Sequence, residues 1–223
     1  MSDDSSRNMF ENEIIAYGLL SSNKNVAKLI KVLRCDEDYD IMMIEYLGEI
    51  NGLDYLIKND KFDTFFYFLA KAIESLEILK INHGDLHLKN VMIVNGTIKL
   101  FDFGLAKGPQ FLPSNWGGNI VYSRTHENFI VGQDLHDFIA LYFIKRPEIN
   151  IPDNLRNKLI SLLNTVSYDT YQKGIEKYET ENNFVSTTYN SKTIYIGLEL
   201  FKHHKKTSGK HILEMMLNYM NDI

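Results

Sequence analysis

The pair Asn95-Gly96, set between two apolar runs, constrains the fold of this chain more than any other local feature. The flanking runs are residues 91–94 and 97–101, and both are rich in β-favouring residues. Asn-Gly at such a place favours a two-residue type I′ turn, because both central residues then need positive φ. The pattern therefore predicts a tight hairpin in which Val91 faces Leu100.

Four polar side chains flank this predicted hairpin. Asn90 precedes the first strand and Asp102 follows the second, so the register places both at one end of the hairpin. An amide oxygen and a carboxylate suit Mg²⁺, which also takes oxygens from substrate phosphates. Asp85 lies five positions before Asn90, where its carboxylate can accept a proton from a hydroxyl nucleophile. Lys89, which the register places opposite Asp102, can neutralise charge on a transferred phosphoryl group.

The joint pattern of residues 83–90 and 102–104 resembles the protein-kinase signature, in which H-x-D-x-x-x-x-N precedes D-F-G. The resemblance implies ATP and Mg²⁺ as cofactors, with Asp85 as the catalytic base and Asn90 and Asp102 as metal ligands. It also implies that His83 packs structurally. The sequence His-Gly-Asp-Leu-His is similar to aminoglycoside and choline phosphotransferases as well, which share the kinase fold.

The apolar run 41–47 resembles the last strand of a kinase small lobe and the hinge that follows it. On that resemblance Ile44 is the gatekeeper residue, and Glu45 and Leu47 belong to the hinge that holds adenine through backbone hydrogen bonds. A plain buried strand is the alternative interpretation of the same run.

Helical spacing predicts several further elements. Asp63 is a candidate cap for a long helix that would bury Leu69, Ala72, Ile73, Leu76 and Leu79. Residues 122–142 are similar to the activation-segment end and following helix of casein-kinase-1-like and vaccinia-related kinases. There Asp134 would hold the catalytic-loop backbone, and a helix-capping role does not exclude this. Apolar stripes predict two more helices, with Leu155, Leu159, Leu162 and Leu163 in the first and Ile212, Leu213, Met216, Leu217 and Met220 in the second.

The chain departs from the kinase pattern at its beginning, where neither a Gly-rich loop nor a strand lysine is found. Residues 11–20 resemble the helix that carries the conserved glutamate, and Glu13 is the better match, without a lysine partner. A rival register takes Val26-Ala27-Lys28 as the lysine strand, but too few residues then remain before Ile41 for the glutamate helix. Within the loop, Gly84 replaces the usual Arg and His87 replaces the usual lysine.

Composition excludes several classes of protein. The net charge of −5 argues against dedicated nucleic-acid binding, and no apolar run approaches the roughly 20 residues of a membrane span. The single cysteine, Cys35, suits a reducing compartment. Abundant Asn, Ile and Lys are typical of AT-rich genomes such as those of large DNA viruses or parasites. We therefore expect a cytoplasmic protein, in the host cytoplasm or virion if it is viral. The sequence does not predict its oligomeric state.

Together these patterns predict an α+β, protein-kinase-like fold. Residues 1–47 would form a reduced small lobe ending at the hinge, and residues 48–223 a mainly helical large lobe. The predicted activity is ATP- and Mg²⁺-dependent phosphoryl transfer, most like that of a serine/threonine protein kinase acting on a protein substrate. The missing phosphate loop and lysine motivate an alternative, a catalytically inactive binding or inhibitory module for a partner kinase or its substrate.

Overall fold

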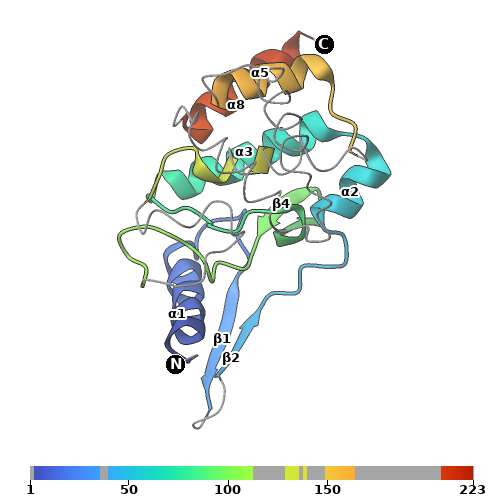
Figure 1. Cartoon of the computed structure of the whole chain (residues 1–223). Helices are drawn as coiled ribbons and strands as arrows, with labels where there is room; N and C mark the ends of the chain where they lie inside the picture. The colour runs from blue at the N-terminus through green and yellow to red at the C-terminus, as the bar shows by residue number, and fades with distance from the viewer. Residues whose placement is uncertain are drawn as a thin grey trace, which may run out of the picture.

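The computed structural model of this chain describes residues 3–35, 40–112, 129–135, 138–139, 149–163 and 207–222. The predictions for residues 122–128 lie outside the described residues. Figure 1 shows the first helix and a two-stranded sheet at one end of the molecule and two helices at the other, with a long helix and a hairpin between them. The elements are α1 (Asp3–Leu19), β1 (Leu29–Arg34), β2 (Asp40–Ile44), α2 (Gly52–Asn59), α3 (Phe62–Glu77), the 3₁₀ helix η1 (Leu88–Asn90), β3 (Val91–Val94), β4 (Thr97–Leu100), α5 (Asp153–Leu163) and α8 (Gly209–Asn221).

The N-terminal part contains α1 beside an antiparallel sheet of β1 and β2, as expected for a reduced small lobe. Arg34 ties these elements together, because its guanidinium lies 2.7 Å from Glu11 on α1 and 2.6 Å from Asp40 on β2. Residues 29–34 form a strand rather than a helix. The register in which Val26-Ala27-Lys28 is the lysine strand is therefore wrong, and α1 is the helix that precedes the sheet.

The core of the molecule is built around α3. Leu69, Ala72, Ile73 and Leu76 are fully buried, which confirms the predicted apolar face of this helix. Leu79 is 42% exposed, because α3 ends at Glu77. Asp63 does not cap the helix as predicted: the N-cap residue is Lys61, and Asp63 lies in the first turn, where it accepts the Thr64 N–H.

The hairpin has the predicted register. Val91 pairs with Leu100, and the turn residues Asn95 and Gly96 have φ values of 50° and 72°, as a type I′ turn requires. The ladder does not continue to position 89, because residues 88–90 turn into η1. The prediction that Lys89 faces Asp102 across the ladder is therefore wrong.

The C-terminal part packs on α3. Helices α5 and α8 form where they were predicted, with Leu155, Leu159, Ile212 and Met216 buried, although Leu217 is 43% exposed. Glu77 at the end of α3 accepts the backbone N–H of Gly132 at 2.7 Å and that of Gly209 at 2.6 Å. This one carboxylate therefore joins α3 to the first turn of α8 and to the segment that carries Asp134.

Candidate active site

The loop between α3 and the hairpin is held by the buried carboxylate of Asp134. Its Oδ2 accepts the backbone N–H of His83 at 2.8 Å, and its Oδ1 accepts that of Gly84 at 3.1 Å. Asp134 is 2% exposed, so both bonds form away from water and fix the loop backbone. The prediction that Asp134 holds this loop is confirmed.

Gly84 has a steric reason to be glycine. Its φ is +81°, and a Cβ atom placed there would lie 1.9 Å from the carbonyl oxygen of Leu105. No side chain fits at that distance, so the arginine common at this position in kinases has no room here. The loop backbone instead lies directly against the segment that follows Asp102.

His83 packs structurally, as predicted. Its ring is fully buried and lies 4.6 Å from the Phe103 ring, measured between centroids. Nε2 lies 2.9 Å from the Phe101 carbonyl oxygen, and Nδ1 accepts the Asp85 N–H at 3.4 Å. A carbonyl can only accept, so Nε2 carries a proton and donates it to the Phe101 carbonyl oxygen. His83 therefore links the Asp85 loop to the strand end before Asp102.

Asp85 and Asn90 lie next to each other in the loop. The Asn90 side-chain amide donates through Nδ2 to the Asp85 carbonyl oxygen at 3.1 Å, and Asn90 is only 5% exposed. That bond turns the amide nitrogen toward the loop and leaves Oδ1 available as a ligand atom. The Asp85 carboxylate is half-buried beside it.

Asp102 joins this group through the backbone, since the N–H of the preceding residue, Phe101, donates to the Asn90 carbonyl oxygen at 3.3 Å. Asp102 itself has a φ of 65°, which is unusual for a residue other than glycine. One amide oxygen and one carboxylate are hard donors that fit Mg²⁺ when phosphate oxygens complete the shell. Within the described residues no group of three or more His, Cys, Asp or Glu side chains is arranged to hold a metal without such phosphates.

His87 lies in the same group, although our sequence interpretation did not include it among the site residues. Its Nε2 is 3.6 Å from Asp85 Oδ2. Burial lowers the pKa of His87 below its ordinary value of 6.5, although the carboxylates of Asp85 and Asp102 oppose this change. Its place two residues after Asp85 was the available sequence signal. Lys89, by contrast, lies on η1 with an exposed side chain.

Glu13 lies on α1 and interacts with Asp102. Its Oε1 accepts the Tyr17 hydroxyl at 3.0 Å, and the Tyr17 oxygen accepts the Asp102 backbone N–H at 3.3 Å. Burial raises the pKa of Glu13 to about 7, and the negative charge of Asp102 acts in the same direction, while the bond from Tyr17 opposes it. In the part of the chain that the structure describes, no lysine forms an ion pair with Glu13. Tyr17 was missed, although its i, i+4 spacing from Glu13 places both on one helix face.

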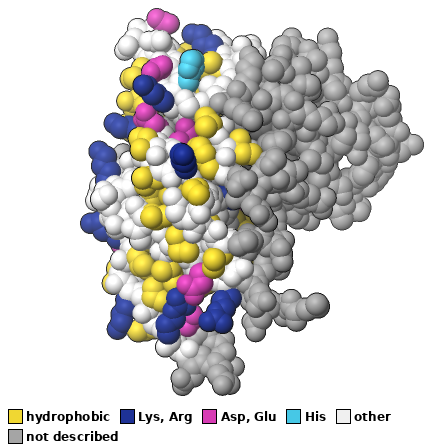
Figure 2. Space-filling view, turned by 90° about the vertical axis from the view of Figure 1, so that its left-hand side faces the viewer, with side chains coloured by type: hydrophobic (Ala, Val, Ile, Leu, Met, Phe, Trp, Pro, Cys, Tyr) yellow, Lys and Arg dark blue, Asp and Glu magenta, His cyan; other side chains and the backbone are white. Residues whose placement is uncertain are grey.

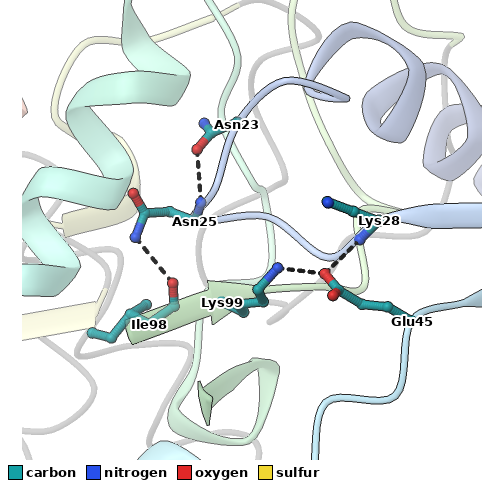
Figure 3. A network of polar contacts seen from close by, with 6 residues as sticks. All are labelled: Asn23, Asn25, Lys28, Glu45, Ile98 and Lys99. Atoms are coloured by element: carbon teal, nitrogen blue, oxygen red, sulfur yellow. Dashed lines mark hydrogen bonds and ion pairs between the residues drawn. The ribbon is translucent and has the colours of Figure 1, made fainter. Parts of the chain in front are cut away.

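The predicted hinge is tied to β4 by the polar network in Figure 3. The Glu45 N–H donates to the Lys28 carbonyl oxygen at 2.9 Å, and the Glu45 carboxylate accepts the Lys28 N–H at 2.9 Å and pairs with the Lys99 ammonium. Burial alone would raise the pKa of Glu45, but the bonds from Lys99 and Lys28 outweigh it and hold that pKa below its ordinary value. The Glu45 side chain therefore anchors the predicted hinge segment.

The two other predicted hinge-region residues lie beside that anchor. Leu47 is 8% exposed and belongs to the core. Ile44, the last residue of β2, is half-buried and packs against that core. The alternative interpretation, a plain strand across residues 41–47, is wrong for residues 45–47, because β2 ends at Ile44.

On the face that Figure 2 draws, the described residues form no patch of a single charge. Basic and acidic side chains are interspersed there with apolar ones. Of the helices described, none combines the length and the apolar character needed to cross a bilayer.

Comparison with known proteins agrees with this arrangement. A family model described as the protein kinase domain matches residues 1–113, which is about half of the chain. The chain is also 30% identical over 105 residues to the serine/threonine-protein kinase mph1 of Schizosaccharomyces pombe. That match covers 44% of this chain and 16% of the yeast kinase. With this family match and a kinase-like arrangement of loop, hairpin and helices, the chain belongs to the protein kinase family.

Proposed function

We propose that this chain is an ATP- and Mg²⁺-dependent phosphotransferase that acts as a serine/threonine protein kinase on a protein substrate. The observation that carries the proposal is the arrangement of Asn90. Its amide nitrogen is bound to the Asp85 carbonyl, and its backbone carbonyl accepts from the residue before Asp102. The proposed base and the two proposed metal ligands are thus connected by two hydrogen bonds.

In this proposal each side chain has a separate task. Asp85 orients the substrate hydroxyl and accepts its proton, which typically contributes about 10²–10⁴-fold. Asn90 Oδ1 and the Asp102 carboxylate hold Mg²⁺, which when bound neutralises phosphate charge. Lys89, whose side chain is exposed on η1, would contact the transferred phosphoryl group. The backbone after Ile44, at Glu45 and Leu47, would hold the adenine.

A second candidate function is a kinase-like binding module without turnover. The observation that favours it is Glu13, which accepts a hydrogen bond from the Tyr17 hydroxyl and pairs with no lysine among the described residues. A lysine paired with this glutamate is one of the parts that kinases use to place ATP phosphates. Such a module would bind a kinase or its substrate through the same fold and transfer no phosphate.

The test compares phosphate transfer from γ-labelled ATP by the wild type and by Asp85→Asn, with Mg²⁺ present. Asp60→Asn is the matched control, because Asp60 is exposed on the loop after α2 and asparagine tolerates its positive φ of 48°. We expect Asp85→Asn to reduce turnover by about 10²–10⁴-fold and Asp60→Asn to leave it unchanged. Turnover that survives Asp85→Asn would reject the proposed base.

A thermal-shift measurement on the same proteins separates the two candidate functions. Mg²⁺-ATP at 100 times its Kd should stabilise the wild type by about 2.7 kcal/mol. The phosphotransferase proposal expects this stabilisation together with transfer. Stabilisation without any transfer in the wild type would favour the binding module.

A further inference from the structure

The hydroxyl of Tyr17 connects the first helix of the chain to the strand end that carries Asp102. We propose that Tyr17 is a positioning residue for Asp102, holding this metal ligand in place through its backbone in a site where Glu13 has no lysine partner among the described residues. The proposal rests on the proposed function in one respect, namely that Asp102 binds Mg²⁺.

The Tyr17 hydroxyl both accepts and donates a hydrogen bond. Tyr17 is 1% exposed, so its hydroxyl cannot rely on bulk water. Its oxygen accepts the Asp102 N–H at 3.3 Å, and its proton is donated to Glu13 Oε1 at 3.0 Å. The backbone N–H of Asp102 can only donate, so the Tyr17 oxygen accepts it, and the phenolic proton is directed to Glu13 Oε1. The Tyr17 hydroxyl therefore links the Asp102 backbone to the Glu13 side chain.

Asp102 has a backbone conformation that needs such support. Its φ of 65° lies in the left-handed region, which residues with a Cβ adopt only at an energetic cost. The neighbours on each side are also held: the Phe101 carbonyl oxygen lies 2.9 Å from His83 Nε2. The Phe103 ring packs edge-on against Tyr17 with 5.7 Å between centroids. Tyr17 thus contacts Asp102 through its hydroxyl and Phe103 through its ring.

The helix that carries Tyr17 is itself fixed against the segment after Asp102. Asn12 is fully buried, and its side-chain amide donates to the Leu112 carbonyl oxygen at 2.9 Å and accepts the Leu112 N–H at 2.7 Å. Near the start of this segment, Gly104 lies against Met9, and a Cβ added to the glycine would be 3.5 Å from the Met9 Cβ. Residues 102–112 therefore lie along α1 and are bonded to it at both ends. A hydroxyl on this helix is held in a constant place relative to Asp102.

The test variant is Tyr17→Phe, which removes the hydroxyl and keeps the ring against Phe103. Tyr67→Phe is the matched control, because it makes the same chemical change at a half-buried tyrosine on α3. Two quantities are measured for wild type and both variants. One is the Mg²⁺ concentration that gives half-maximal ATP binding or turnover. The other is the hydrogen-exchange rate of the Asp102 amide by NMR, with α3 amides as the reference for global unfolding.

We expect Tyr17→Phe to raise the half-maximal Mg²⁺ concentration by about two- to tenfold, the range for loss of one hydrogen bond. Turnover at saturating Mg²⁺ should recover, because Asp85 and Asn90 are untouched. Exchange at the Asp102 amide should become faster while exchange in α3 stays unchanged. Tyr67→Phe should alter neither quantity. A merely structural tyrosine would instead change α3 exchange and leave the Mg²⁺ requirement as it was.

Failure of this inference is separable from failure of the proposed function. If the wild type binds Mg²⁺-ATP and Tyr17→Phe leaves the Mg²⁺ requirement or the Asp102 exchange rate unaltered, the positioning role is overturned. If the wild type binds no Mg²⁺-ATP, the proposed function fails, and the exchange rate of the Asp102 amide alone then tests the positioning role of Tyr17. Faster exchange at Asp102 in Tyr17→Phe then still supports the holding role, and unchanged exchange overturns it.

Discussion

Replacing Glu13 with glutamine should remove a pH-dependent loss of stability from this protein. Burial raises the pKa of Glu13 from 4.5 to about 7 in the folded chain, helped by the negative charge of Asp102. The folded state therefore binds the proton more tightly than the unfolded chain does. The contribution of Glu13 to the free energy of unfolding is fully present below pH 4.5 and is lost as pH rises through about 7.

The size of the effect follows from the two pKa values. The complete loss corresponds to about 3 kcal/mol, at 1.36 kcal/mol for each tenfold change in proton affinity. Between pH 5 and pH 8.5 the wild type should lose about 2.5 kcal/mol relative to Glu13→Gln, because part of the loss already precedes pH 5. Glutamine can still accept the Tyr17 hydroxyl, so the substitution removes the charge and retains the bond.

Urea unfolding at a series of pH values from 5 to 8.5 measures this difference. Glu49→Gln is the control, since Glu49 is exposed. The free energy of unfolding of Glu13→Gln minus that of the wild type should grow with pH, while the same difference for Glu49→Gln stays flat. Parallel curves for wild type and Glu13→Gln would refute the conclusion that Glu13 is ionised at a cost in this site.

Three further sets of substitutions test other parts of the structure by urea unfolding. Gly84→Ala should lose well over 3 kcal/mol or fail to fold, since its Cβ would meet a carbonyl oxygen at 1.9 Å. Gly48→Ala has a similar positive φ but open space, so it should lose only about 1 kcal/mol, and equal losses would contradict the clash. Asp134→Asn should lose about 2 kcal/mol by weakening its bonds to two loop amides, and a loss near zero would deny that they hold the loop. A double-mutant cycle of Lys99→Met with Glu45→Gln should give a coupling of about 1 kcal/mol, and no coupling would mean that this ion pair does not stabilise the hinge.

The sequence predicted the hairpin well because its determinants are local. The pair Asn95-Gly96 defines the turn by its backbone preferences, and the turn sets the register from Val91 to Leu100. The position of Lys89 could not be read from that ladder. Residues 88–90 leave the strand in a 3₁₀ turn, closed by the Asn90 N–H donating to the His87 carbonyl oxygen at 2.9 Å.

Contacts between distant segments account for most of what the sequence did not predict. Tyr17 and Asp102 are 85 positions apart, and Lys99 and Glu45 are 54 apart, so no local pattern pairs them. Gly84 was visible as a departure from the kinase pattern, but its cause is a carbonyl oxygen some 20 positions later that only the fold brings near. Sequence reasoning therefore named the candidate site residues and the loop-holding Asp134, and it missed Tyr17 and the pairing of Lys99 with Glu45.

The central claim is that Asn90 and Asp102 form a cation site for Mg²⁺-ATP. Calorimetric titration of ATP into the wild type and Asp102→Asn, each with Mg²⁺ and with EDTA, tests it most directly. We predict that wild-type binding depends on Mg²⁺ and that Asp102→Asn weakens it by about tenfold or more in Mg²⁺, the loss of a carboxylate ligand, with equal affinities in EDTA. Wild-type affinity that is the same with and without Mg²⁺, or unchanged in Asp102→Asn, would contradict the claim.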